Sequence, residues 1–316
     1  MFRLLNLKSG CVATTLPCAL TIGNFDGVHR GHQAMLGCLQ AAAAERGLPA
    51  TVMTFEPHPR EVFTPALAPA RLTSLREKIE LFRLLGVERL VLVRFSPRFA
   101  RLSPQEFIQE ILLTGIQARW VLIGDDFKFG AKRAGDLAVL REAGIQHGFE
   151  VASLGSVLVD GERVSSTAVR AALAQGDLDQ ARQFLGRPYS ISGRVVHGDK
   201  LGQELGFPTA NIQMKHNKPP LSGIFAVELS RFTQLDRPDG HRLPGVASLG
   251  VRPTVKVDGV ATLEVHIFDF HARIYGAHVR VDFLRKLRDE EKFPDLPTLI
   301  AQIERDVVEA KKYFNL

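Results

Sequence analysis

The first half of the chain alternates short apolar runs with longer amphipathic stretches. The apolar runs have the length and the large or β-branched side chains of buried strands. They cover residues 19–23, 50–55, 89–95 and 120–124. The stretches between them space their apolar residues as helices do, and several end at a glycine. They cover residues 32–46, 74–85, 104–113 and 135–147. This order predicts an α/β domain with a parallel sheet, helices on both faces and ligands at the carboxyl ends of the strands.

The pattern changes near Gly186. Two short helices are expected first, and strand-like segments follow them. The helices cover residues 168–174 and 178–185, and the strands cover 189–196, 224–229, 246–249, 262–267 and 278–283. Leu263, Val265 and Ile267 alternate with polar residues, as in a half-buried strand. A last helix is expected over residues 296–313. The second part is therefore predicted to be a small antiparallel β-barrel or sandwich with a terminal helix, of which we favour the barrel, and the domains are predicted to cover residues 1–186 and 187–316.

Composition agrees with two globular domains. The chain has 316 residues, of which 45% are hydrophobic and 23% charged, so it can bury sizeable cores and is not disordered throughout. Its 40 basic and 34 acidic residues give a net charge of +6, which suits anionic ligands from a nucleotide to a nucleic acid. Cys11, Cys18 and Cys38 fit no zinc or redox spacing. Without a signal-peptide core or a membrane-spanning stretch, we expect a soluble cytoplasmic protein.

The strongest chemical signal is the string GNFDGVHRGH at residues 23–32, between a strand and a helix. Glycines let a backbone approach a phosphate, and a helix N-terminus offers N–H groups and a partial positive charge. His29 and His32 are three residues apart and can point to one side, where they would stabilise charge on a phosphoryl oxygen. A single histidine there is more often structural, but two histidines framed by glycines favour a function.

This element resembles the HxGH signature of the nucleotidylyltransferase superfamily. The longer string resembles the adenylyltransferase half of bacterial bifunctional riboflavin kinase/FAD synthetases. Three later segments are similar to that family as well: FEPHP at residues 55–59, GDDFKFG at 124–130 and VSSTAVR at 164–170. The resemblance implies a Rossmann-like nucleotidylyltransferase fold for the first domain.

The third segment makes chemical sense beside the histidines. Residues 165–167 would start a helix that carries Arg170, and hydroxyls, amides and a guanidinium are the groups that hold the β- and γ-phosphates of ATP. A plain helix cap with a solvated arginine is the alternative. The resemblance implies His29, His32 and Arg170 as catalytic residues, and it implies these ATP-binding residues: Gly23, Phe25, Asp26, Gly31, Asp126, Arg163, Ser165, Ser166 and Thr167. It implies a flavin site at Phe55, Phe63 and Phe129, each of which also reads as a core residue.

The second domain carries an independent set of motifs. Residues 193–211 read GRVVHGDKLGQELGFPTAN, which resembles the ATP- and magnesium-binding element of riboflavin kinases. The resemblance implies ATP binding by Gly198, Lys200, Gly202 and Gly206, and Mg²⁺ binding by the hard oxygens of Thr209 and Asn211. A turn with an Asx-type hydrogen bond is the alternative for Thr209 and Asn211.

Glu264 matches the catalytic glutamate of the family, and its predicted strand face is opposite the apolar one. A kinase needs a group that deprotonates or orients the attacking hydroxyl, which is the role expected of Glu264. A surface glutamate on a half-exposed strand is the alternative, and His266 shares the same face. The segments 250–254 and 283–293 also match the family. Arg285 is expected to bind the flavin. Arg252 and Arg288 are expected either to close over ligands or to be solvated surface residues.

The resemblance as a whole implies a bifunctional enzyme of flavin cofactor synthesis. ATP with Mg²⁺ would phosphorylate riboflavin to FMN in the second domain, and a second ATP would adenylylate FMN to FAD in the first, releasing pyrophosphate. The expected partners are these small molecules, with no nucleic acid, no membrane and a homo-oligomer left open. Two rivals remain: a monofunctional adenylyltransferase with a regulatory barrel, and an RNA-binding module suggested by the high pI. Dispersed Lys and Arg argue against the second rival.

Overall fold

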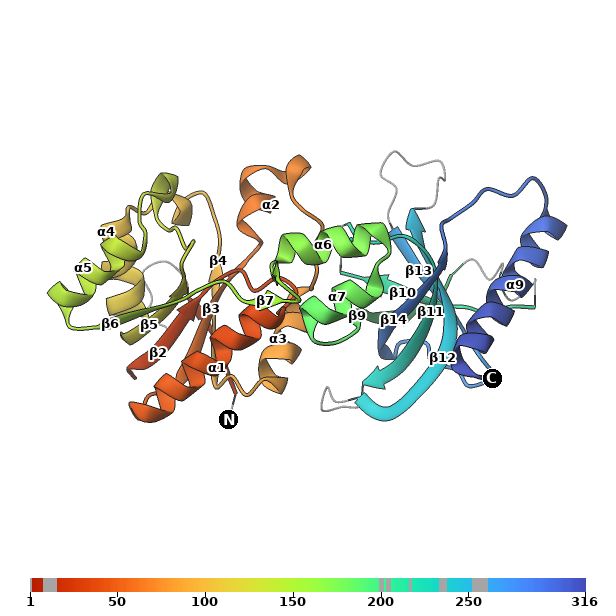
Figure 1. Ribbon diagram of the computed structural model, residues 1–316, viewed down its shortest axis with the longest axis horizontal. Coiled ribbons are helices and arrows are strands. Elements are labelled where there is room, and N and C mark those ends of the chain that lie inside the picture. The colour runs from red at the N-terminus through yellow and green to blue at the C-terminus, as the bar shows by residue number, and fades with distance from the viewer. Residues whose placement is uncertain are drawn as a thin grey trace. The chain divides into compact units, whose positions relative to one another are not determined.

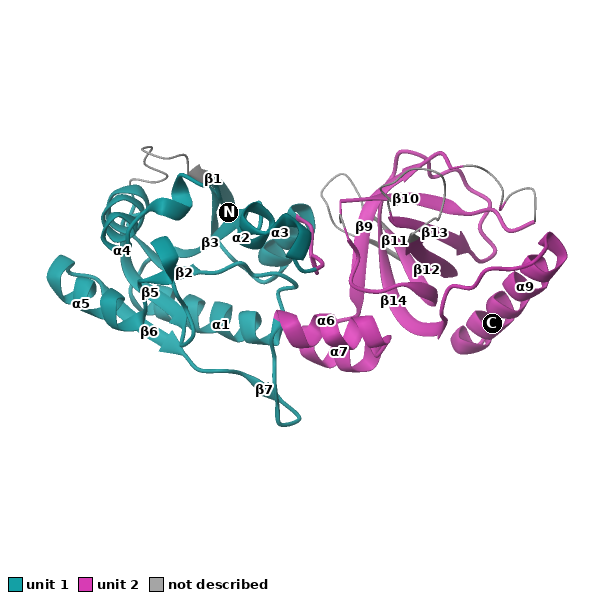
Figure 2. Cartoon of the chain, turned by 90° about the horizontal axis from the view of Figure 1, so that it is seen from above, with its two compact units in different colours: residues 1–69, 75–165 teal, residues 70–74, 166–316 magenta. Residues whose placement is uncertain are grey.

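The computed structural model describes residues 2–7, 16–198, 202, 206–215, 218–232, 238–251 and 261–316. The chain forms two compact units, coloured teal and magenta in Figure 2. Unit 1 comprises residues 1–69 and 75–165, and unit 2 comprises residues 70–74 and 166–316. None of the helices in the described ranges combines the length and apolar character that a bilayer-spanning segment requires.

Unit 1 is built on a six-stranded sheet whose strands all run parallel, in the order β1-β4-β3-β2-β5-β6 (Figure 1). The strands are β1 (Arg3–Leu7), β2 (Cys18–Ile22), β3 (Ala50–Glu56), β4 (Arg89–Arg94), β5 (Ala118–Gly124) and β6 (Glu150–Leu154). The expected parallel sheet is confirmed. The sequence did not predict β1 and β6, which lie at the two edges, because an edge strand does not need a continuous apolar run.

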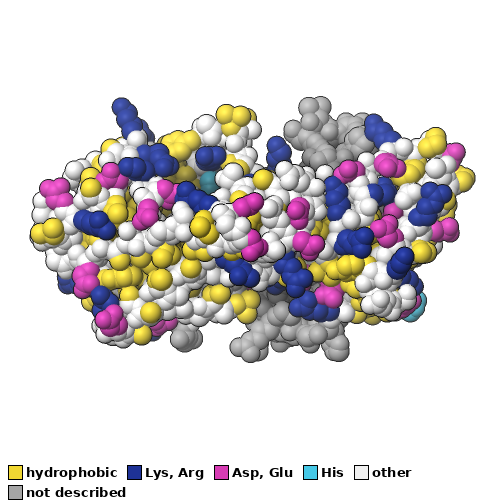
Figure 3. Space-filling model, viewed as in Figure 1, with side chains coloured by type: hydrophobic (Ala, Val, Ile, Leu, Met, Phe, Trp, Pro, Cys, Tyr) yellow, Lys and Arg dark blue, Asp and Glu magenta, His cyan; other side chains and the backbone are white. Residues whose placement is uncertain are grey.

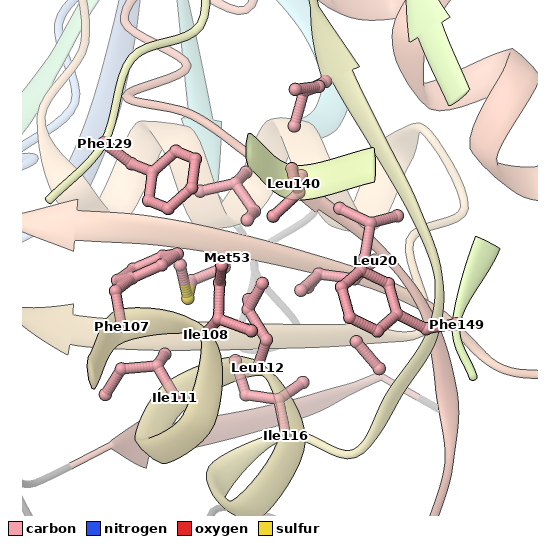
Figure 4. Packing of buried hydrophobic residues seen from close by; sticks show 14 of the residues in the cluster. Leu20, Met53, Phe107, Ile108, Ile111, Leu112, Ile116, Phe129, Leu140 and Phe149 are labelled. Atoms are coloured by element: carbon pink, nitrogen blue, oxygen red, sulfur yellow. The ribbon is translucent and has the colours of Figure 1, made fainter. Parts of the chain in front are cut away.

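Helices cover both faces of this sheet, which confirms the second part of the prediction. The helices are α1 (Arg30–Glu45) and α3 (Leu75–Leu84) on one face, and the π-helix η3 (Phe107–Gly115) and α5 (Leu137–His147) on the other. Strand β2 alternates between the two cores: Ala19 belongs to the cluster with Leu36 and Phe82, whereas Leu20 packs in the cluster with Ile108 and Leu140. Figure 4 shows this second core, with the η3 side chains directed at the strands.

The helix expected over residues 104–113 begins where the sequence places it but is not a regular α-helix. A reciprocal capping box starts α4 (Pro104–Glu106): Glu106 N donates to Ser103 Oγ at 3.2 Å, and Ser103 N donates to Glu106 Oε2 at 2.7 Å. The chain then continues directly as the π-helix η3. Phe107, Ile111 and Leu112 of this π-helix are buried in the core of unit 1, and no local sequence pattern distinguishes its wider turn from an α-helix.

Short elements follow the carboxyl ends of the strands and so surround the edge where ligands are expected. They are α2 (Pro59–Phe63) and η1 (Pro65–Leu67) after β3, η2 (Phe99–Arg101) after β4, η4 (Ala131–Arg133) after β5, and the hairpin β7 (Leu158–Val159) and β8 (Glu162–Arg163) after β6. The hairpin turns at Asp160 and Gly161, both with positive φ, the conformation that tight two-residue hairpin turns require.

Unit 2 is a closed six-stranded antiparallel barrel with a terminal helix, as predicted. The strand order is β10-β13-β12-β11-β14-β9. The strands are β9 (Tyr189–Val196), β10 (Ala210–Met214), β11 (Gly223–Phe232), β12 (Pro238–Val251), β13 (Ala261–Ile267) and β14 (His278–Arg288). Leu263, Val265 and Ile267 are buried, and Glu264 and His266 between them are half-buried, so the predicted alternation is present.

Helices precede and follow the barrel strands in unit 2. They are α6 (Ser166–Gln175), α7 (Leu178–Leu185) and α9 (Leu296–Phe314). Helix α7 contacts β9 and β14, so both helices that precede the expected boundary near residue 187 pack within the barrel unit. Helix α9 starts at Asp295, whose carboxylate accepts a 2.8 Å hydrogen bond from Thr298 N, and it contributes Ala310 to a buried cluster with Phe268 and Ala226.

Candidate active sites

In unit 1 the two motif histidines meet at the first turn of α1. His29 is the N-cap of this helix, and its Nδ1 accepts a 3.3 Å hydrogen bond from the backbone N of His32. The two imidazole rings stack with centroids 3.7 Å apart and an interplanar angle of 17°. Because Nδ1 accepts a hydrogen bond, the proton of a neutral His29 ring lies on Nε2. The spacing therefore places both rings together, as predicted.

The glycines of this motif make room for the stacked rings. A Cβ on Gly31 would lie 3.2 Å from both Cε1 and Nδ1 of His29, so a side chain there would press on the imidazole. A Cβ on Gly23 would lie 3.1 Å from the Phe25 ring. Phe25 is buried at 1% exposure and its ring centroid lies 4.9 Å from that of His32. Phe25 thus supports the His32 ring from the core side.

A cavity of about 360 Å³ opens beside the histidines. It is lined by His29, Gly31, His32, Met35, Gly124, Asp125, Asp126, Leu154, Gly155, Ser156, Val157, Arg163, Val164 and Ser165. Across it, Arg163 of β8 and Asp126 form an exposed ion pair at 2.8 Å. The structure therefore brings together six of the expected ATP-site residues: His29, Gly31, His32, Asp126, Arg163 and Ser165.

The remaining expected residues of this site lie elsewhere. Asp26 is buried at 5% exposure and, like Phe25, is not part of the cavity lining. Ser166 and Thr167 begin α6, which belongs to unit 2 and also carries Arg170. Within unit 2, Arg170 Nε donates a 2.6 Å hydrogen bond to the carbonyl oxygen of Ala70.

A second cavity of unit 1, of about 730 Å³, is aromatic. Phe55, Phe63 and Phe129, the three expected flavin residues, all line it, together with Gly23. Phe63 is 61% exposed, which is unusual for a phenylalanine with only a core role. Asp126 lines this cavity as well as the previous one, so the two cavities meet at its side chain.

Sequence reasoning missed most of the aromatic lining. Phe95 contacts the rings of Phe55 and Phe63 with centroids 5.8 and 5.5 Å apart, and Phe99 contacts Phe55 at 5.8 Å. Basic residues stand at the same cavity: Arg60, Arg101, Lys128, Lys132 and Arg133. Phe95 and Phe99 follow β4 and belong to no quoted motif, so only the fold brings them to this edge.

In unit 2 the motif residues of β10 and β13 lie side by side on neighbouring strands of the barrel. Asn211 on β10 pairs with Glu264 on β13, and Glu264 pairs in turn with Ser248 on β12. Thr209, just before β10, donates from Oγ1 to Glu264 Oε2 at 3.4 Å. The Nδ1 atom of His266 lies 3.0 Å from the carbonyl oxygen of Pro208. The expected base and the expected metal ligands are thus neighbours across adjacent strands.

The glycines of the 193–211 segment allow close approach to these ligands. A Cβ on Gly198 would overlap the side-chain amide of Asn211. A Cβ on Gly202 would lie 2.5 Å from the carbonyl oxygen of Phe207 and 3.3 Å from Thr209 Oγ1. Gly206 has a φ of +87°, which favours glycine. Lys200 and Arg252, also expected near ligands, lie outside the described residues.

Two cavities of unit 2 share Thr209. The larger, about 660 Å³, is lined by Gly202, Phe207, Thr209, Asn211, Ile224, Val246, Ser248, Glu264, His266, Arg288, Glu290, Glu291, Phe293, Asp295, Leu296, Leu299, Ile303 and Asp306. The other, about 560 Å³, is lined by Val195, His197, Pro208, Thr209, Ala210, Val265, Ile267, Phe270, His271, Ala272, Arg273, Ile274 and Tyr275. The rings of His197 and Tyr275 stack there at 4.0 Å. Arg285 is exposed and lines neither cavity, whereas Arg288 lines the larger one.

The donor set at Thr209 and Asn211 fits Mg²⁺. A hydroxyl oxygen and an amide oxygen are hard donors, and the carboxylate of Glu264 is adjacent. In the described residues no group of three or more His, Cys, Asp or Glu side chains is arranged to enclose a metal ion. A site with so few protein ligands suits Mg²⁺, which retains waters and substrate phosphates in its coordination shell.

Two family models match the chain one after the other. The family described as FAD synthetase matches residues 12–168, and the family described as riboflavin kinase matches residues 185–314. The first match covers the His29 and Ser165 motifs, and the second covers the 193–211 segment and Glu264. The expected relationship to both halves of the bifunctional family is confirmed.

Curated relatives and a solved structure agree over nearly the full length. The bifunctional riboflavin kinase/FMN adenylyltransferase of Escherichia coli K12 is 47% identical over 300 residues, covering 95% of this chain and 93% of the relative. That of Pseudomonas fluorescens is 47% identical over 294 residues, covering 93% and 92%. A crystal structure described as a macrolide-efflux protein from Streptococcus pneumoniae has a TM-score of 0.79 at 30% identity and covers 96% of this chain and 97% of that one.

Proposed function

The chain belongs to the bifunctional riboflavin kinase/FMN adenylyltransferase family, and we propose that the two groups of residues described above carry one reaction each. The C-terminal domain phosphorylates riboflavin to FMN, and the N-terminal domain adenylylates FMN to FAD. One observation, made in both units, supports the assignment of these residues to the two reactions. In each unit two cavities share one polar lining residue, which is Thr209 in unit 2 and Asp126 in unit 1. Group transfer between two substrates needs such a junction.

In the kinase site, riboflavin occupies the 660 Å³ cavity, because Glu264 and the apolar residues Phe293 and Leu299 line it. ATP occupies the 560 Å³ cavity, with its phosphates directed at Thr209. Glu264 accepts the proton of the ribityl 5′-hydroxyl while that oxygen bonds to the γ-phosphorus and the bond to the β-γ bridging oxygen breaks. The hydrogen bond from Thr209 holds the Glu264 carboxylate toward this junction.

Thr209 and Asn211 would hold Mg²⁺, which when bound neutralises phosphate charge. Gly198 and Gly202 let the preceding loop approach these two side chains closely. The backbone N–H groups of a glycine-rich loop suit a phosphate chain. We therefore assign Gly198, Gly202 and Gly206 to the triphosphate where it meets the junction, since Gly202 lines the 660 Å³ cavity but lies against Thr209, the residue that both cavities share. The assignment of Lys200 to ATP rests on the resemblance alone.

In the adenylyltransferase site, the flavin ring of FMN occupies the aromatic cavity and ATP occupies the cavity at the histidines. An FMN phosphate oxygen bonds to the α-phosphorus of ATP, the bond to the α-β bridging oxygen breaks, and pyrophosphate leaves. No protein nucleophile is needed. His29 donates from Nε2 to the α-phosphoryl oxygens, and the stacked His32 adds to the stabilisation of their charge. Most of the acceleration comes from alignment and charge stabilisation.

Ser165 lines the cavity at the histidines, and its hydroxyl suits a phosphate oxygen of ATP. For the β- and γ-phosphates the resemblance also implies Ser166, Thr167 and Arg170, and these three residues belong to unit 2. We assign Phe25 a supporting role beneath His32, whose ring it contacts. For Asp26, which is buried, the assignment to the ATP site rests on the resemblance.

We propose the cytoplasm as the location and riboflavin, FMN and ATP as the partners, with no nucleic acid among them. Cys18 and Cys38 are free thiols, and burial raises the pKa of Cys18 to about 11, which keeps it protonated and unreactive near neutral pH. Figure 3 shows Lys and Arg interspersed with Asp and Glu over the visible face rather than gathered in one basic patch, which supports a protein that does not bind nucleic acid.

Two reciprocal variants test the assignment. Glu264→Gln is expected to lower FMN formation from riboflavin by about 10²-fold or more and to leave FMN-to-FAD conversion unchanged. His29→Ala is expected to lower FMN-to-FAD conversion by about 10²-fold and to leave FMN formation unchanged. Chromatography of the flavin products from riboflavin or FMN with Mg-ATP measures both steps.

Glu142→Gln and His147→Ala are matched controls, because both residues are exposed on α5 and line none of these four cavities. Both controls are expected to behave as wild type. If either site variant lost both activities while remaining folded, the division of the residues between the two reactions would be wrong.

A further inference from the structure

Arg288, at the end of β14, is fixed from several directions in the kinase cavity. Its Nε and Nη2 atoms donate to the two carboxylate oxygens of Asp306 on α9 at 2.9 and 2.7 Å. Its Nη1 donates to the carbonyl oxygen of Asp289 at 3.0 Å. The guanidinium carbon lies 5.6 Å from the ring centroid of Phe293. The bidentate geometry leaves the guanidinium a single orientation.

Asp306 is dedicated to this contact. It is buried at 4% exposure, and its Oδ1 also accepts a 2.9 Å hydrogen bond from Gln302 Nε2 on the preceding turn of α9. The hydrogen bond to Asp306 is the main cause that raises the pKa of Arg288 above its usual value. The carboxylate is therefore held by two partners and is almost wholly buried, although the residue is part of the cavity lining.

Holding the helix on the barrel does not require this ion pair. Helix α9 is already attached by apolar contacts: Ala310 packs with Phe268 and Ala226, and the Phe314 ring contacts that of Phe268. A buried ion pair adds little net stability compared with apolar residues of the same size, because both charges lose their water. What the pair does supply is a fixed direction for one cationic side chain that lines a substrate cavity.

Arg288 keeps donors available for a ligand. A guanidinium has five N–H groups. Asp306 and Asp289 accept three of them, so two have no acceptor within the described residues. The neighbouring lining combines the apolar residues Phe293, Leu299 and Ile303 with the acidic residues Glu290 and Glu291, which suits an uncharged flavin ring better than a triphosphate. The flavin ring carries carbonyl oxygens and ring nitrogens that accept such hydrogen bonds.

We propose that Asp306 is a positioning residue of the riboflavin kinase site, which holds Arg288 so that its two remaining N–H groups donate to acceptors on the flavin ring of riboflavin. This rests on the proposed placement of riboflavin in the 660 Å³ cavity. Asp306 itself does not contact the substrate. Its effect should therefore fall on riboflavin binding rather than on ATP binding or phosphoryl transfer.

Asp306→Asn tests this role, because the amide keeps the volume but loses the charge and one of the two acceptors. The KM for riboflavin is expected to rise about tenfold, with the KM for ATP and kcat changed less than about twofold. Glu304→Gln is the matched control, since Glu304 is an exposed acid on the same helix. FMN-to-FAD conversion by the same molecules is expected to stay unchanged and shows that unit 1 is folded.

A double variant separates positioning from a purely structural role. If Asp306 acts through Arg288, then Arg288→Gln with Asp306→Asn should raise the KM for riboflavin no more than Arg288→Gln alone. Additive effects, or parallel changes in both KM values and kcat, would show that α9 has merely loosened. Gln302→Leu is the milder second variant, should Asp306→Asn fail to fold; it is expected to raise the KM for riboflavin about threefold.

An unchanged KM for riboflavin in folded Asp306→Asn would overturn the inference. The proposed function fails in a different way. If Glu264→Gln still makes FMN at the wild-type rate, the kinase assignment is wrong whatever Asp306 does. If Glu264→Gln abolishes FMN formation and Asp306→Asn leaves the KM for riboflavin unchanged, only the positioning role is lost.

Discussion

Asp126 is the side chain at which the two cavities of unit 1 meet, and its negative charge is unexpected there. Both proposed ligands bring phosphate groups to this junction, so a carboxylate repels them. Arg163 offsets that repulsion, because its guanidinium pairs with Asp126 at 2.8 Å, but an exposed pair of this kind contributes little net energy. An asparagine at this position would keep an acceptor and add a donor without the charge.

Asp126→Asn is therefore expected to improve adenylylation. Removing the charge lowers the repulsion and leaves Arg163 available for a phosphate, so kcat/KM for FMN and ATP should rise by about fivefold, equivalent to roughly 1 kcal/mol. Initial rates of FAD formation from FMN measure the effect. Asp160→Asn, in the exposed hairpin turn, is the control. A fall in kcat/KM would mean that the carboxylate itself takes part in the reaction.

At the scale of elements, the paired strands β9 and β10 position the proposed Mg²⁺ ligand Asn211 through a close contact just beyond the end of β9. Gly198 follows β9, and its backbone lies against the side chain of Asn211 on β10, so that a Cβ would overlap the amide. The φ of Gly198 is not in the positive range that favours glycine. An alanine there is consequently tolerated by the backbone and acts only by displacing Asn211.

Gly198→Ala is expected to lower the rate of FMN formation by roughly 10²-fold, because a shift of about 1 Å in a positioned group costs that much. FMN-to-FAD conversion should be unchanged. Gly37→Ala is the control: nothing lies within 4 Å of a Cβ there, and alanine is the better helix former in α1. Kinase kinetics like those of the wild type would mean that Asn211 is not a positioned ligand.

Sequence reasoning succeeds for elements whose signal is local. The alternation of Leu263, Val265 and Ile267 predicts β13, and the amphipathic stretch over residues 104–113 correctly predicts that a helix begins at Pro104. Sequence reasoning fails for elements whose conformation depends on tertiary packing. The continuation of α4 as a π-helix and the edge strands β1 and β6 have no local pattern that separates them from the alternatives.

The candidate sites divide in the same way. Motif spacing alone brings His29 beside His32, because both lie on one helical turn. Asn211 and Glu264 pair only because β10 and β13 are neighbours in the barrel, and the resemblance rather than the spacing indicated that they act together. Arg288 and Asp306 are joined across a strand and a helix. No local spacing in the sequence predicts a contact between these two residues, so it is seen only in the folded structure.

At the scale of the whole molecule, the product of one reaction is the substrate of the other. On the proposed placement, FMN forms in a cavity whose described lining residues belong to unit 2, and its flavin ring must then enter a cavity whose described lining residues belong to unit 1. FMN therefore has to leave the first cavity before the second reaction, and the simplest route is through solvent.

Mixing two inactivated chains tests this route. Glu264→Gln lacks the kinase activity and His29→Ala lacks the adenylyltransferase activity, so neither alone should convert riboflavin to FAD. Together they are expected to form FAD after a lag during which free FMN accumulates, and dilution of both proteins should lengthen the lag because transfer through solvent depends on concentration. Chromatographic time courses at two dilutions measure this. A mixture that makes FMN but no FAD, although the Glu264→Gln chain converts added FMN, would mean that transfer requires both sites on one chain.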